Sequence, residues 1–417
     1  MNNYQLVGPF KQLLPMTGLP AKGALQDTDL ELIENGGIIV HDGFIVAIGK
    51  YTNIVHQAKA LNATKIVLDE DFVGLPGLID AHTHICFAGS RAKDYALRNA
   101  GKTYLEIAQS GGGIWDTVTQ TRNADQTALE SAIADRAMRH LKNGITTIEV
   151  KSGYGLSVAE ELKLLKAIKN ANALLPTDLI PTCLAAHMLP KDYQGTEEDY
   201  LLEIATTLFP LLKKEKLSNR IDAFIETSAF SPQTIQSYFE KAVAMGFDLT
   251  VHADQFSTGG SELAVQFNAV SADHLEASTG KEIELLAKSN VVAMALPGAS
   301  LGLGCNFTPA RKLLDAGACL AIASDWNPGS APMGNLLSQA SILGTFEKLT
   351  NAEVLAGITT RAALALKLHD RGSLKTGNIA DFIAFPASNY QEITYQQGEL
   401  QPTMVWKKGI LAHSIAK

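Results

Sequence analysis

Cysteine, basic clusters and long apolar runs are scarce in this sequence of 417 residues, and each scarcity argues against a class of protein. The four cysteines are widely spaced and form no CxxC pair, which disfavours a disulfide framework or a thiolate metal site and suits a reducing compartment. No basic run stands out and the net charge is −8, so a nucleic-acid-binding surface is not expected. Apolar runs such as 291–297 are far too short to cross a membrane.

The first twenty residues also lack the basic segment and unbroken apolar stretch of a cleaved secretion signal. What the chain does have is the composition of a folded protein. Hydrophobic residues make up 46% and charged residues 19%, so a large core is possible and global disorder is excluded. We therefore expect a globular protein of the cytoplasm that binds neither nucleic acid nor membrane.

Buried strands alternate with helical sequence through the middle of the chain. Residues 126–143 and 158–172 have apolar positions at helical spacing and are expected to be helices. Strands buried on both faces and separated by helices are typical of a (β/α)₈ barrel. The sequence therefore predicts an α/β fold with such a barrel at residues 75–369. The eight expected strands are residues 77–82, 145–150, 179–186, 221–226, 248–252, 269–274, 291–296 and 319–325.

Both ends of the chain have a different, turn-rich β texture. In GGIIVHDGFIVAIGK, Asp42 and Gly43 interrupt alternating apolar positions, which predicts a hairpin. After residue 370, GSLKTGNIADFIAF and PTMVWKKGILA have the same character. We expect residues 1–74 and 370–417 to form one small composite β domain beside the barrel.

Residues that bind metals or move protons stand at the ends of six expected strands. A buried histidine at a strand end is, taken alone, more often structural, but the set together favours a functional site. Active sites of barrels lie at the carboxyl ends of the strands, so these side chains are expected to converge. They are His82 and His84 after the first strand, then His187, Glu226, His252, His274 and, after the eighth, Asp325.

His82 and His84 are two residues apart at a strand end, so both side chains are expected on one face, about 6.5–7 Å apart at Cα. With His252 and Asp325 they supply three nitrogens and one oxygen. This set is typical of catalytic zinc or iron with room for a water molecule, and it leaves the choice between the two metals open. Such an ion would lower the pKa of water to about 7.

Four motifs in order, GLPGLIDAHTH, HADQ, SADHLE and SDWNPGS, resemble the amidohydrolase superfamily in its single-metal branch. The segments EVKSGYGL, LAAHMLP, VHADQFSTGG and ASDWNPGSAP are similar to its members in histidine degradation. In those members, water opens the ring of 4-imidazolone-5-propanoate to give N-formimidoyl-L-glutamate. The resemblance covers nearly the whole chain. It implies a distorted TIM-like barrel, a flanking β-sandwich built from both termini, and a homodimer acting on a small molecule.

The resemblance also implies roles for individual residues. One zinc or iron ion per subunit would be held by His82, His84, His252 and Asp325. His274 is implied as a proton carrier or oxyanion stabiliser, and Asp325 could also accept the proton of the water; which of them is the main base stays open. Arg91 is implied to pair with the propanoate tail and His187 to address the ring carbonyl. The implied substrate-binding set is Arg91, Tyr154, His187, Gln255, Asn327, Gly329 and Ser330.

Gln255 and Lys151 bear on the alternatives. Related deaminases have a glutamate proton shuttle where Gln255 stands, and glutamine cannot carry a proton near pH 7. Gln255 thus counts against the second hypothesis, a deaminase of another nitrogen heterocycle. A third hypothesis, a barrel without catalysis that serves as a scaffold, is disfavoured because all four ligands are present. Lys151 closes the second expected strand, not the fourth, so the bridging lysine of two-metal members is missing; Lys151 is expected to be structural or a charge behind the ligands.

Overall fold

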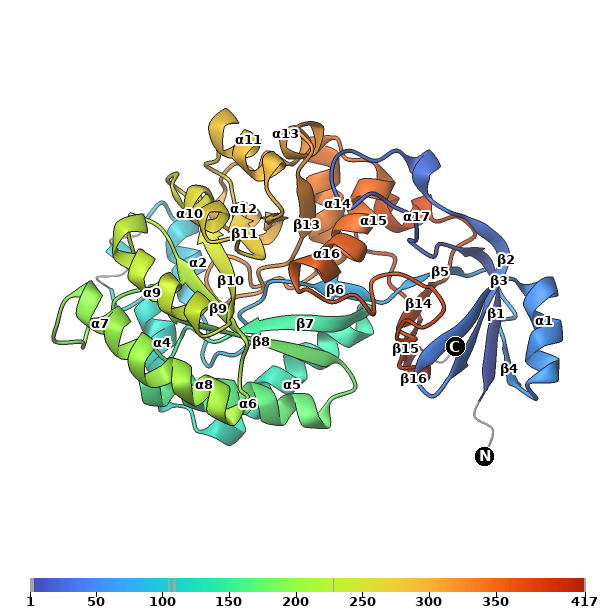
Figure 1. Ribbon diagram of the computed structural model, residues 1–417, viewed down its shortest axis with the longest axis horizontal. Helices are drawn as coiled ribbons and strands as arrows, with labels where there is room; N and C mark the ends of the chain where they lie inside the picture. The colour runs from blue at the N-terminus through green and yellow to red at the C-terminus, as the bar shows by residue number, and fades with distance from the viewer. Residues whose placement is uncertain (1–3, 104–105, 108–109, 228, 416–417) are drawn as a thin grey trace.

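The computed structural model describes residues 4–103, 106–107, 110–227 and 229–415. Within these ranges the strands form two eight-stranded sheets, one wrapped in helices and the other at the side (Figure 1). Among the described residues no helix combines the length and apolar character that a membrane span needs.

The first sheet is the predicted barrel. Its strands are parallel and neighbours in sequence order, with irregular register between β6 and β7 and between β8 and β9. Beyond β6 and β13 the sheet nearly closes, because Asp325 N donates to His82 O at 3.0 Å and His84 N to Trp326 O at 2.9 Å. All eight expected strands are present. They are β6 (Leu78–Asp80), β7 (Ile145–Lys151), β8 (Asp178–Ala186), β9 (Arg220–Phe224), β10 (Asp248–Ala253), β11 (Ser271–His274), β12 (Val292–Ala295) and β13 (Cys319–Ile322).

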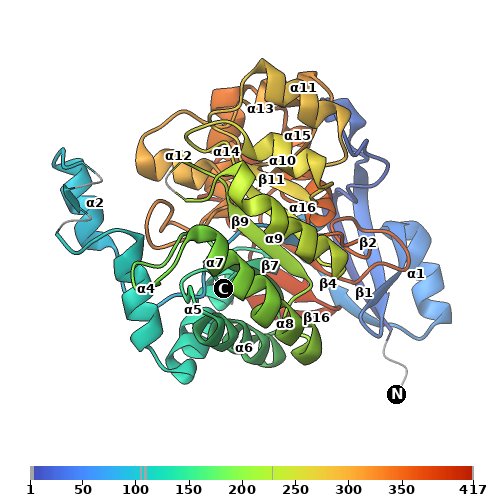
Figure 2. The same ribbon diagram turned by 60° about the vertical axis from the view of Figure 1, so that its left-hand side comes forward.

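Helices surround this sheet because its strands are apolar on both faces and need covering. The two expected helices are confirmed as α5 (Gln126–Lys142) and α6 (Val158–Leu174), whose first turns are capped by the side chains of Asp125 and Ser157. The α2 helix reaches outward at one edge (Figure 2). The others are α2 (Ala92–Asn99), α4 (Ile114–Asn123), α7 (Glu197–Glu203), the π-helical η2 (Ile204–Leu208), α8 (Phe209–Glu215), α9 (Pro232–Ala244), α10 (Gly260–Gln266), α11 (Gly280–Lys288), α12 (Pro297–Leu303), α13 (Ala310–Asp315), α14 (Leu336–Glu347), α15 (Asn351–Gly357) and α16 (Thr360–Ala365).

The second sheet is built from both ends of the chain, in the order β16-β15-β14-β5-β1-β2-β3, with β4 paired to β1. The N-terminal and C-terminal segments of the chain meet where β5 and β14 pair antiparallel. Phe10, Phe382 and Trp406 are buried in the core of this second sheet. The expected hairpin turn is present, with Asp42 and Gly43 at φ 49° and 86°. The strands are β1 (Gln5–Leu13), β2 (Ile33–His41), β3 (Phe44–Lys50), β4 (Thr64–Val67), β5 (Val73–Pro76), β14 (Phe382–Phe385), β15 (Met404–Lys407) and β16 (Ile410–Ser414).

This arrangement confirms the predicted fold class, a (β/α)₈ barrel with a β domain from both termini. The second sheet continues two residues past residue 74, because β5 runs to Pro76. The predicted domain limits, 1–74 with 370–417 for the β domain and 75–369 for the barrel, stay a prediction. Residues 1–3 and 416–417 lie outside the described ranges. Helices in the terminal segments were not expected: η1 (Asp27–Asp29), α1 (Tyr51–Ala60) and α17 (Gln391–Tyr395). In α1, Ile54 and Ala58 are buried, and Tyr51 and Val55 are partly buried beside them. These four positions have helical spacing, so a signal for this helix was present in the sequence.

Candidate metal centre and active site

The predicted site residues meet in one cavity of about 660 Å³ at the carboxyl ends of the barrel strands. His82 lies just behind the wall and is fully buried. Glu226, at the end of the fourth strand, does not line the cavity; its carboxylate accepts hydrogen bonds from the backbone N–H groups of Phe256 and Ser257 and thereby holds the loop after β10. The predicted residues that line the cavity are His84, Arg91, Tyr154, His187, His252, Gln255, His274, Asp325, Asn327, Gly329 and Ser330.

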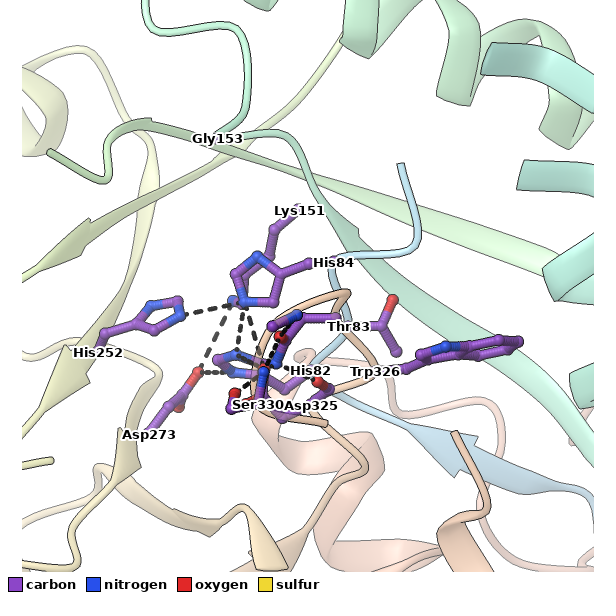
Figure 3. A network of polar contacts seen from close by, with 12 residues as sticks. His82, Thr83, His84, Lys151, Gly153, His252, Asp273, Asp325, Trp326 and Ser330 are labelled. Carbon is purple, nitrogen blue, oxygen red and sulfur yellow. Dashed lines mark hydrogen bonds and ion pairs between the residues drawn. The ribbon is translucent and has the colours of Figure 1, made fainter. Parts of the chain in front are cut away.

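Three histidines turn their Nε2 atoms toward a common point (Figure 3). His84 Nε2 lies 3.2 Å from His82 Nε2 and 3.3 Å from His252 Nε2. Asp325 Oδ1 completes the group, 3.4 Å from His84 Nε2 and 3.5 Å from His82 Nε2. All four side chains are buried. The four residues proposed as ligands from distant parts of the sequence are therefore neighbours in space.

The chemistry of these four groups fits a divalent cation. Burial lowers the pKa of His82, His84 and His252, so the imidazoles are neutral and their lone pairs can bind a metal. Burial also raises the pKa of Asp325 to about 7, and its Oδ1 has no hydrogen-bond partner among the described residues. A cation at this point would satisfy that oxygen and stabilise the carboxylate. Three nitrogens and one oxygen match zinc or iron.

Two aspartates that sequence reasoning missed lie behind the histidines. Asp273 Oδ2 is 2.7 Å from His82 Nδ1, and Asp222 Oδ2 is 3.0 Å from His252 Nδ1. Because each Nδ1 faces a carboxylate, the proton is placed there and Nε2 is left free for an ion. A signal was present in the sequence: Asp222 interrupts the apolar run IDAF, Asp273 precedes the strand-end histidine in SADH, and a buried carboxylate needs a partner.

His274 lies beside this group, with ring centroids 5.3 Å from His252 and 5.9 Å from His82. Its Nδ1 is 3.5 Å from Glu276 Oε1. Although burial opposes protonation, the Glu276 carboxylate raises the pKa of His274 above its ordinary value. His274 and Asp325 both have positive φ, 87° and 51°. Such backbone conformations are costly for residues other than glycine and are concentrated at functional sites.

His187 has a defined tautomer. Its Nδ1 lies 2.9 Å from the carbonyl oxygen of Gly153, which can only accept, so Nδ1 carries the proton. Burial lowers the pKa of His187 to about 4, and the neutral ring therefore offers Nε2 as an acceptor. The ring is stacked on His84 with centroids 5.6 Å apart, and Tyr154 lies 5.6 Å away. Burial raises the pKa of Tyr154, which keeps its hydroxyl protonated.

Two arginine side chains also line the cavity. Asp94 accepts a hydrogen bond from Arg91 Nε and fixes the guanidinium. A Cβ atom at Gly329 would lie 3.3 Å from Arg91 Nη1, so the loop passes close to this cation. Arg98, which sequence reasoning missed, also lines the cavity and donates to Gly329 O at 3.2 Å. No sequence motif marked it.

The loop after Asp325 is held by Asn327. Its amide nitrogen donates to Asp325 O at 2.8 Å, and its amide oxygen accepts from the backbone N–H groups of Gly329 and Ser330, each at 2.8 Å. Asn327 therefore shapes the loop, and its amide is largely used within the protein. Gln255, by contrast, lines the cavity and its amide makes no hydrogen bond to the described residues, which leaves it available to a ligand.

Comparison with known proteins agrees with this geometry. A model of the amidohydrolase family matches residues 73–411, and the chain belongs to this family. It is 38% identical to an imidazolonepropionase of Bacillus cytotoxicus over 92% of this chain and 90% of that one, and 39% identical to one of Yersinia enterocolitica over 91% and 93%. Within the family the chain thus groups with the imidazolonepropionases, as its motifs indicated.

Solved structures confirm the fold. A triazine hydrolase from Arthobacter aurescens matches with a TM-score of 0.73 and 17% identity, over 99% of this chain and 95% of that one. An adenosine deaminase from Xanthomonas campestris with bound zinc matches with a TM-score of 0.70 and 18% identity, over 98% and 93%. At these identities the likeness establishes the barrel and its flanking sheet and does not choose a reaction.

Proposed function

We propose that this protein opens the ring of 4-imidazolone-5-propanoate with water to give N-formimidoyl-L-glutamate, a step in histidine degradation. The observation that carries the proposal is the 38% identity to an imidazolonepropionase over 92% of the chain. The cavity suits that chemistry, because the group of proposed metal ligands and an arginine that can hold the propanoate line the same cavity. Zinc or iron, one ion per subunit, is the cofactor we propose, with His82, His84, His252 and Asp325 as its ligands.

The reaction adds water to the ring carbonyl carbon and breaks the bond from that carbon to the ring nitrogen. When bound, the ion polarises a carbonyl and lowers the pKa of water to about 7. In this proposal Asp325 accepts the proton of the attacking water. His274, oriented by Glu276 through Nδ1, keeps Nε2 free to give a proton to the departing nitrogen, which stays tethered to the product.

The other cavity residues bind the substrate in this proposal. Arg91 pairs with the propanoate through the guanidinium edge that Asp94 leaves free. The acceptor at His187 Nε2 takes an N–H of the ring, because donation to the ring carbonyl would need a second proton on an imidazole whose pKa is about 4. Tyr154 donates from its hydroxyl, Gln255 contacts the ring nitrogens, and Asn327 holds the loop of Gly329 and Ser330.

We also propose that the protein is a homodimer of the cytoplasm. The four cysteines are all free, as expected of a protein in a reducing compartment. The dimer rests on the family resemblance. Size-exclusion chromatography with light scattering would measure the mass in solution, and a single-chain mass would contradict it.

Arg91→Ala is expected to raise KM for the substrate about 10- to 100-fold, because a charged hydrogen-bonded pair to the propanoate is lost. The metal content should not change, since Arg91 makes no contact with the four ligands. Arg311→Ala is the matched control: Arg311 also pairs with acids, Asp315 and Glu353, but away from the cavity. Steady-state kinetics and elemental analysis of both variants test this. If Arg91→Ala lost metal to the same extent as substrate binding, Arg91 would have a role other than binding the propanoate.

A direct assay tests the proposed function. Purified protein loaded with zinc or iron(II) is given freshly made 4-imidazolone-5-propanoate, and N-formimidoyl-L-glutamate is measured by mass spectrometry. An Asp325→Asn variant prepared in the same way controls for contaminating enzymes. Failure of the metal-loaded protein to consume the substrate would refute the proposal, and release of ammonia from another nitrogen heterocycle would favour the deaminase alternative.

A further inference from the structure

A buried lysine that the proposed reaction does not use lies behind the metal-binding histidines. Lys151 ends β7 and its side chain is 1% exposed. Its Nζ is 2.8 Å from Asp222 Oδ2, 2.9 Å from Glu149 Oε1 and 3.7 Å from Asp273 Oδ2. Figure 3 shows it beside the histidines and Asp273. Three buried carboxylates therefore share this one ammonium group.

Two of these three carboxylates are the ones that orient metal-binding histidines. Asp222 contacts His252 and Asp273 contacts His82, each through the Oδ2 atom that also faces Lys151. Asp222 is on β9 and Asp273 on β11, strands that are separated by β10. Lys151 comes from β7, which is a neighbour of neither strand, and so connects the two histidine–aspartate pairs from another part of the barrel.

The charges explain why the ammonium matters. Two like charges in a buried site repel each other unless a cation lies between them, and an uncompensated buried carboxylate is costly. Asp273 has a second donor, Thr250 Oγ1 at 3.1 Å. Asp222 is more dependent on Lys151, because apart from Lys151 and His252 its carboxylate has no hydrogen-bond partner among the described residues. Without Lys151, we therefore expect Asp222, and with it His252, to move more than Asp273.

We propose that Lys151 is a positioning residue whose ammonium group holds Asp222 and Asp273 in the orientation that points His252 and His82 at the metal ion. The inference rests on the proposed metal centre, but not on the identity of the substrate. According to this proposal, Lys151 on the second barrel strand contributes to metal affinity, although no atom of Lys151 would touch the metal.

The chain offers a matched control in Lys407, on β15 of the second sheet. Its side chain is 3% exposed, and its Nζ lies 2.8 Å from Asp178 Oδ2 and 2.5 Å from Asp381 Oδ2. Lys407→Met thus also removes a buried ammonium group from between two carboxylates, but at a place that has no contact with the histidines. If both variants bind Zn²⁺ more weakly, the cause is general destabilisation. If only Lys151→Met binds Zn²⁺ more weakly, the cause lies at the metal centre.

The test measures Zn²⁺ affinity directly, by competition of each metal-free protein with a chromophoric chelator. Wild type, Lys151→Met and Lys407→Met are compared after circular dichroism has confirmed folding. Loss of a residue that orients ligands typically weakens metal binding 10- to 100-fold. We expect Kd for Zn²⁺ to rise by about that factor in Lys151→Met and to stay within about twofold of wild type in Lys407→Met. Wild-type affinity in folded Lys151→Met would overturn the proposal.

Lys151→Arg keeps the test decisive if Lys151→Met does not fold. It retains the positive charge, but its larger head displaces Asp222 and Asp273. We expect weaker Zn²⁺ binding and an altered visible spectrum of the Co²⁺-substituted protein; an unchanged affinity and spectrum would overturn the proposal. Wild-type protein that binds no Zn²⁺ would refute the metal centre, whereas protein that binds Zn²⁺ without consuming 4-imidazolone-5-propanoate would refute only the proposed reaction.

Discussion

Replacing His252 by alanine is expected to remove both the metal and the turnover. His252 supplies one of three neutral imidazoles at the proposed centre, with Nε2 3.3 Å from His84 Nε2. Two imidazoles and one carboxylate would remain, and with one of the four proposed ligands gone we expect the ion to be bound more weakly and lost on dialysis. The contribution of the metal to the reaction amounts to several kcal/mol, so we expect kcat/KM to fall about 10³-fold or more. Elemental analysis after dialysis and the substrate assay measure the two losses.

His413→Ala provides the comparison for this variant. His413 is on β16 of the second sheet and does not line the cavity, so its loss should change neither metal content nor rate. If His252→Ala kept a full complement of metal, His252 would not be a ligand and the proposed centre would need another fourth group. Loss of metal without loss of turnover would instead contradict the metal-dependent reaction.

His274→Asn is the second change with a large expected effect, and it acts on a different step. Removal of a proton-transfer group typically costs 10²- to 10⁴-fold in rate, and we expect kcat to fall about 10³-fold with little change in KM. Metal content should stay that of wild type, because His274 is not among the four proposed ligands. Asparagine is chosen because φ at this position is 87°, a conformation that asparagine tolerates better than alanine does.

Rapid-mixing and steady-state kinetics of the metal-loaded His274→Asn variant test this. A kcat within about tenfold of wild type would contradict the role as proton donor. A loss of metal equal to that in His252→Ala would show that His274 acts on the centre itself. Together, His252→Ala and His274→Asn distinguish the residue that binds the metal from the residue that transfers the proton.

The barrel and the central four residues of the site were predictable from the sequence for one physical reason. Strands buried on both faces are recognisable as short apolar runs, and a histidine or aspartate that ends such a run marks the carboxyl edge. Every expected strand is present, and His82, His84, His252 and Asp325 lie together although they come from distant segments.

Other features depend on contacts across the barrel that no local pattern records. Asp222 and Asp273 could be identified as unusual buried acids, but only the structure pairs them with particular histidines. The tautomer of His187 follows from the position of the Gly153 carbonyl, which is 34 residues away. The α1 helix is an exception, because Tyr51, Ile54, Val55 and Ala58 have helical spacing and a local signal was therefore present.

The backbone contacts between the ends of β6 and β13 have a consequence for folding. His82 and His84 lie on one side of this junction and Asp325 on the other, and the segments join through only a few hydrogen bonds. An ion held by all of them would crosslink the earliest and the latest parts of the barrel. Since unfolding must break that crosslink, protein with more ion bound is expected to resist denaturation better. The ion would then serve both the reaction and the stability of the barrel that holds it.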